Sequence, residues 1–165
     1  MAIQTRRPNA LLAISWGGFS CGVLDITAAF VVYGFFGAKP IPILKGIAAG
    51  VMGAKARQGG LETAALGLFL HFVIAFGATI VYFVASRFMS FLTKHAVTAG
   101  FLYGIAVNLF MGYVVVPLSA IGPRRSPFSL RGTIIGIVIH MFCVGLPIAL
   151  SIRKHATPER FQNRA

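Results

Sequence analysis

Four long apolar runs constrain the fold of this chain more than any other feature. They cover residues 11–37, 61–86, 96–118 and 133–152. A helix needs about 20 mostly apolar residues to cross a hydrocarbon core roughly 30 Å thick, and each run is at least that long. Because unpaired backbone groups are costly in lipid, each run is expected to form a membrane-spanning helix. The sequence therefore predicts an all-α integral membrane protein, a four-helix bundle with up-down-up-down topology.

The composition is typical of a chain with almost no water-soluble part. Only 11% of the 165 residues are charged, whereas about a quarter are charged in a soluble domain. Residues 1–165 are therefore expected to form a single transmembrane domain with a polar C-terminal tail at 155–165. The first run exceeds the roughly 7–15 apolar residues of a signal peptide, so it is expected to remain as a span.

The net charge of +12 comes from 15 Lys and Arg against three acids. These bases lie in loops and in the tail, where the anionic headgroups of the lipid bilayer are the nearest partner. No basic stripe with interleaved aromatic residues is present, so nucleic acid is not an expected partner. The loop charges nearly balance across the membrane, and Arg6, Arg7 and the basic tail favour cytoplasmic N and C termini.

The first loop differs from an ordinary turn. Apolar residues recur at helical spacing over residues 41–57, together with Lys45, Lys55 and Arg57. The segment is too short and too charged to span a membrane. It indicates either a short interfacial helix, which could also cap the bundle, or a loop with a single helical turn.

Each run carries one strongly polar residue near its centre, and at about 1.5 Å per residue all four lie at similar depth. These residues form the predicted midplane site: Asp25, His71, Asn108 and His140. Small residues mark contacts between helices in lipid, because they let backbones approach closely. The predicted packing glycines lie on the same helical stripes as the polar residues: Gly18, Gly22, Gly67, Gly100, Gly104, Gly112 and Gly136.

The stripes also predict which residues face away from the site. In the fourth run the stripe continues from His140 to Cys143 and Pro147. Bulky residues lie off the stripes and are expected to face lipid, among them Phe69, Phe72, Phe76 and Phe142.

Three kinds of function are compatible with the midplane site. A carboxylate at the bilayer centre costs about 2.5–3.5 kcal/mol on insertion scales, so Asp25 needs a proton or a partner. Hydrogen bonds within the layer could simply hold the helices together, as in a structural or accessory protein. Asp and His are also the residue types that relay protons or bind cations inside spans. The leading hypothesis is a small transport or proton/cation-handling protein, with a homo-oligomer compatible with it.

The third alternative is a haem b or metal-binding membrane protein. Two histidines at equal depth are what bis-His haem requires, and His71, His140 and Asp25 are metal-ligand types. Asp25 beside a porphyrin is unfavourable and no dense ligand spacing is present, so neither cofactor is favoured. The motifs of soluble enzymes are missing from the sequence, and an enzyme is not expected.

Three segments of the sequence resemble a group of small bacterial inner-membrane proteins described as a domain of unknown function. They are ILKGIAAG at 43–50, GLFLHF at 67–72 and YVVVPLS at 113–119. The resemblance covers most of the chain. It implies four spans in a bacterial inner membrane and brings no activity with it.

Overall fold

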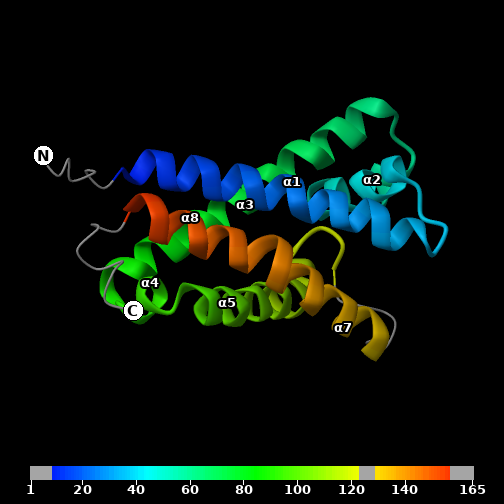
Figure 1. Cartoon of the computed structure of the whole chain (residues 1–165). Coiled ribbons are helices and arrows are strands. Elements are labelled where there is room, and N and C mark those ends of the chain that lie inside the picture. Colours follow the sequence, from blue (N-terminus) through cyan, green and yellow to red (C-terminus); the bar gives the residue numbers. More distant parts are fainter. Residues whose placement is uncertain (1–8, 123–128, 157–165) are drawn as a thin grey trace, which may run out of the picture.

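Within residues 9–122 and 129–156, which the computed structural model describes, the chain forms four long apolar helices packed as a bundle, plus a shorter helix (Figure 1). The first two spans are α1 (Ala10–Gly34) and α3 (Leu61–Phe88). The third comprises α5 (Ala96–Phe110), a π-helical turn (Met111–Val115) and α6 (Val116–Leu118). The fourth comprises α7 (Leu130–Ile139), a π-helical turn (His140–Gly145) and α8 (Leu146–Ala156). The predicted all-α bundle is confirmed.

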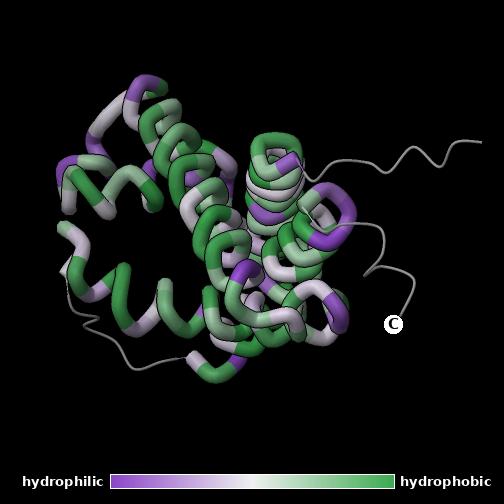
Figure 2. Tube along the Cα trace, turned by 90° about the vertical axis from the view of Figure 1, so that its left-hand side faces the viewer, coloured by the Kyte–Doolittle hydropathy of each residue, from purple (hydrophilic) through white to green (hydrophobic). Residues whose placement is uncertain are grey.

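The four spans are 25, 28, 23 and 27 residues long in the described part of the chain. Viewed along the bundle, hydrophobic residues cover the spans and hydrophilic residues gather at turns and helix ends (Figure 2). The backbone N–H of Asn9 donates to the carbonyl of His155 at 2.8 Å, so α1 begins where α8 ends. By helix length and hydropathy the chain is a multi-pass membrane protein.

Two span boundaries differ from those predicted. The first span ends at Gly34, because the following turn places Gly37 at φ +84° and Pro40 then opens the next helix. The fourth begins at Leu130, since the Ser129 hydroxyl caps it by accepting the Gly132 N–H at 3.2 Å. It continues to Ala156, so the helix takes up the first two residues of the expected polar tail, and residues 157–165 lie outside the described part.

The first loop contains the expected short helix, α2 (Pro40–Met52), followed by a 3₁₀ turn (Gly53–Arg57). Proline is well tolerated at the first position of a helix, because the backbone N–H that it lacks would have no partner there. Ala48 and Ala49 are buried near Leu66 of α3. The N–H of Ala120 donates to the Gly50 carbonyl at 2.9 Å, so α2 connects α3 to the end of the third span. At the other end of the bundle, α4 (Phe91–Lys94) links the second and third spans.

The spans do not all pack closely against their neighbours. Helix α1 lies against α3 and α8, and α5 lies against the fourth span. A Cβ at Gly145 would overlap the carbonyl of Gly100, which shows how closely α5 and the fourth span approach. Among the described residues, α3 and α5 meet mainly through Tyr103, whose hydroxyl donates to the Ala78 carbonyl at 2.7 Å. The two helices therefore stand apart over much of their length.

Two phenylalanines expected to face lipid are instead half-buried between α1 and α3. A Cβ at Gly18 would lie 2.5 Å from the Phe76 ring, and one at Gly22 would lie 2.6 Å from the Phe72 ring. These glycines make room for aromatic rings rather than for a neighbouring backbone, which corrects the prediction for both rings. Phe69 is 63% exposed, as expected.

The π-helical turns change which residues of the spans face inward. Beyond His140 the buried residues include Val144 and Ile148, whereas the predicted Cys143 and Pro147 are only half-buried. A π turn adds one residue and so rotates the following face of the helix. Each turn contains the residue four positions before a proline, where the proline ring crowds the helix carbonyl and removes an N–H donor. Pro117 and Pro147 were therefore the sequence signal for both turns.

Candidate functional site

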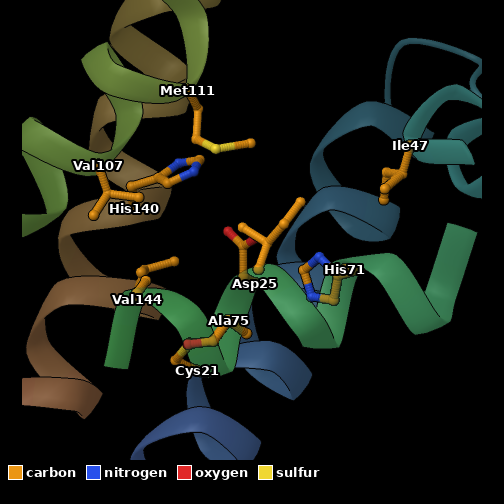
Figure 3. A pocket seen from close by; sticks show the side chains of 11 residues that line it. Cys21, Asp25, Ile47, His71, Ala75, Val107, Met111, His140 and Val144 are labelled. Carbon is orange, nitrogen blue, oxygen red and sulfur yellow. The ribbon is translucent and has the colours of Figure 1, made fainter. Parts of the chain in front are cut away.

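Three of the four predicted polar residues line one cavity. Asp25 comes from α1, His71 from α3 and His140 from the π turn of the fourth span (Figure 3). We call this the Asp25 cavity, and its volume is about 190 Å³. Its remaining lining consists of Cys21, Ile47, Ile74, Ala75, Ala78, Val107, Met111 and Val144. Segments far apart in the sequence thus bring one carboxylate and two imidazoles to a common space.

The fourth polar residue, Asn108, does not line this cavity. Its Nδ2 atom lies 3.3 Å from Nδ1 of His140, and Gly136 leaves the space that its amide occupies. Asn108 therefore contacts the site through His140. The sequence pattern placed it in the same layer but could not distinguish lining the cavity from supporting a lining residue.

His71 is 9% exposed and connects two spans. Its Nε2 atom lies 2.8 Å from the Gly22 carbonyl of α1. A carbonyl oxygen only accepts hydrogen bonds, so Nε2 carries the hydrogen. In the neutral ring, Nδ1 is then an unprotonated acceptor.

His140 has the opposite tautomer. Its Nδ1 atom lies 2.8 Å from the Gly136 carbonyl, one turn earlier in the same span. This contact is shorter than the one to Asn108, and it requires a hydrogen on Nδ1. Because Nδ1 of His140 carries a hydrogen, the Asn108 amide faces it with its oxygen, which requires the amide to be turned by 180°. The neutral His140 ring keeps Nε2 as an acceptor.

Asp25 is half-buried, and within the described residues no hydrogen bond or ion pair reaches its carboxylate. The Cys21 thiol in the same wall points its weak S–H toward the Ala75 carbonyl, 4.0 Å away. The polar groups that line the cavity are thus mainly acceptors: two carboxylate oxygens and, in neutral rings, one nitrogen from each imidazole. Such a wall favours a proton or a cation.

The cofactor alternatives fit this site poorly. Within the described part of the chain, no three His, Cys, Asp or Glu side chains are grouped so that they could hold a metal ion. An engineered cavity of about 150 Å³ holds benzene, and a porphyrin is several times larger than benzene. The Asp25 cavity, at about 190 Å³, is therefore too small to enclose haem.

A second space adjoins the first between α3 and α5. This lateral groove has a volume of about 510 Å³. Ile74, Ala78, Val107 and Met111 line both spaces, so the groove and the cavity share one wall. The groove is further lined by Gly77, Val81, Tyr103, Ala106, Phe110 and Val115. Sequence reasoning missed it, although small residues in α3 and α5 were a signal that the two helices leave space.

The packing glycines separate into two groups. Those in the first three spans, apart from Gly112, meet side chains or backbone of another helix, and Gly136 meets Asn108. Gly112 differs, since a Cβ there would meet no described atom within 4 Å. It does not contribute to packing among the described helices.

Comparisons of the chain with protein-family models, with curated proteins and with solved structures found no match. They identify no family, and the resemblance noted above gains no support from them. Helix length and hydropathy support the description of the chain as a small four-span membrane protein.

Proposed function

We propose that this protein is a small transport protein that binds a proton or a small cation at Asp25. The observation that supports the proposal is that Asp25, His71 and His140 bring acceptor groups to the otherwise apolar wall of one cavity. Asp25 precedes the end of α1 at Gly34 by nine residues, and His71 follows the start of α3 at Leu61 by ten. At about 1.5 Å per residue, both lie roughly 14–15 Å from the same end of the bundle, near the middle of a bilayer.

Each residue has a distinct role in this proposal. Asp25 binds the proton or cation, because its carboxyl group has no hydrogen-bond partner among the described residues. His71 and His140 relay protons, since each keeps one ring nitrogen for exchange while the other is held by a carbonyl. Asn108 positions His140.

A purely structural role is the second candidate, because specific contacts favour it. His71 joins α3 to α1 through Gly22, and the Ser151 hydroxyl joins α8 to α1 by donating to the Ala13 carbonyl at 2.8 Å. Bonds of this kind contribute about 0.6–2 kcal/mol each between membrane helices. A structural role predicts that changes at these residues lower stability and alter no flux.

The test is proton flux into proteoliposomes, followed with a pH-sensitive dye under an imposed potential. Asp25→Asn keeps the shape of the side chain, removes the charge and is expected to lower flux at least about tenfold, as for loss of a proton-transfer group. Thr79→Val is the matched control, since Thr79 is a buried polar residue of α3 outside the cavity. Equal flux in wild type and Asp25→Asn would refute the proposal.

The proposal also covers the membrane, the orientation and the oligomeric state of the protein. The resemblance and the charge pattern favour a bacterial inner membrane, with cytoplasmic termini and with loop bases facing anionic headgroups. A homo-oligomer is the proposed working form, and chemical cross-linking in native membranes tests it. Accessibility of cysteines introduced in α2 and α4, which lie at opposite ends of the bundle (Figure 1), tests the orientation.

A further inference from the structure

The lateral groove adjoins the Asp25 cavity on the side of the bundle between α3 and α5. α1 and the fourth span close the cavity on the other sides, because they pack directly against α3 and α5, respectively. Between α3 and α5, Tyr103 packs on Tyr82 with ring centroids 4.9 Å apart, which closes the groove toward α4. The opposite end lies toward α2, whose Ile47 reaches the Asp25 cavity. The groove therefore lies on the side of the bundle, where a bilayer would place its hydrocarbon.

We propose that the ligand of the Asp25 cavity is a single-chain amphiphilic amine, which enters sideways from the bilayer between α3 and α5. Its alkyl chain would lie in the lateral groove and its amino head in the Asp25 cavity. This inference rests on the proposed function, since it names the class of cation that Asp25 binds.

Charge complementarity selects the amine. The groove offers almost only hydrocarbon surface, with the Tyr103 hydroxyl already bound to the Ala78 carbonyl. The cavity at its inner end offers a carboxylate and imidazole acceptors. An amine that takes up the Asp25 proton supplies three donors and a positive charge to such a wall, whereas an anionic head has no donor for the imidazole nitrogens.

Size and depth exclude an ordinary phospholipid as the ligand. A cavity of about 190 Å³ is somewhat larger than one that holds benzene, which suits a primary amine and its first methylene groups. A zwitterionic headgroup stays at the interface, roughly 14 Å from Asp25 along α1. A primary amine can leave the interface as the neutral base. At the site the O–H bond of the Asp25 acid breaks and an N–H bond forms, which yields an ammonium–carboxylate pair.

Gly77 offers a way to block the groove without touching the Asp25 cavity. It lines the groove only, and a Cβ there would meet no described atom within 4 Å. Gly77→Leu therefore places a side chain in the space assigned to the alkyl chain. Gly112→Leu is the matched control, because Gly112 lies in a span, lines neither space and is equally open.

The experiment measures saturable binding of radiolabelled dodecylamine to the full chain in nanodiscs, relative to empty nanodiscs. Wild type and Gly112→Leu are expected to bind it alike, and dodecanoate, with the same chain and an anionic head, is expected not to compete. Gly77→Leu is expected to weaken binding about tenfold, because the leucine side chain overlaps the alkyl chain and overpacking of this kind costs about 1–3 kcal/mol. Asp25→Asn is expected to abolish saturable binding.

The outcomes separate this inference from the proposed function. If Asp25→Asn abolishes proton flux but wild type binds dodecylamine no better than dodecanoate, the transport proposal stands and the amine is refuted. If Gly77→Leu binds dodecylamine as tightly as wild type, entry through the groove is refuted. If Asp25→Asn loses amine binding while flux is unchanged, the amine site stands and transport is refuted.

Discussion

Alanine at Gly104 should destabilise the protein and alanine at Gly112 should not, although the two glycines lie on one stripe of the third span. A Cβ at Gly104 would overlap the His140 carbonyl and come within 2.6 Å of the Met141 Cα, both of which are backbone of the fourth span. Backbone cannot move aside as a flexible side chain can. The helices would have to separate, and the carbonyl that must give way belongs to a cavity-lining histidine.

The magnitude follows from two terms. Replacing Gly by Ala favours a helix interior by about 0.5–1 kcal/mol, and this gain is common to both variants. Overpacking a close contact costs about 1–3 kcal/mol, and this cost falls on Gly104→Ala alone. Because the common gain cancels, Gly104→Ala should be less stable than Gly112→Ala by about 1–3 kcal/mol. Gly112→Ala should be as stable as wild type or slightly more stable.

Reversible unfolding of the purified proteins in mixed micelles, followed by circular dichroism, measures this difference. The same preparations can be tested for proton flux, which Gly104→Ala should also lower, since it displaces the turn that holds His140. Equal stabilities for the two alanine variants would refute the close approach of α5 to the fourth span. A destabilised Gly112→Ala would show that a partner covers that face.

Three further predictions concern single contacts. Tyr103→Phe keeps the aromatic packing on α3 but loses the hydrogen bond to Ala78, so unfolding in mixed micelles should show a loss of about 0.6–2 kcal/mol. Ser151→Ala removes the bond to the Ala13 carbonyl, and the same assay should show a loss of similar size. The Cys21 thiol is 1% exposed and should react with a membrane-permeant maleimide only after unfolding, as mass spectrometry of labelled protein would show.

The number and kind of elements could be predicted from the sequence, because the forces that determine them are local. Apolar length and the need to pair backbone groups within lipid identify a spanning helix without knowledge of its neighbours. The helix of the first loop was one of two alternatives that the helical spacing of its apolar residues left open, and the structure shows the helix. The predicted ends of the spans were less accurate, since they depend on caps such as Ser129 and on turns such as that at Gly37.

The candidate site could be predicted in part. One polar residue per span, on a stripe of small residues, was enough to select Asp25, His71 and His140, which line one cavity. The stripe could not show that Asn108 stands beside His140 outside that cavity, because depth and face together do not specify which neighbour a side chain meets.

The tertiary structure alone decided how the helices are spaced. Gly104 and Gly112 look alike in the sequence, yet a Cβ at Gly104 would meet backbone and a Cβ at Gly112 would meet open space. The reason is that the third span packs against the fourth only along part of its length. The π turns rotate the inner face of the fourth span, and Phe72 and Phe76 fill the space that Gly22 and Gly18 leave in α1. The groove between α3 and α5 exists because neither helix is the other's packing partner, and the order of packing depends on contacts between segments that no local pattern encodes.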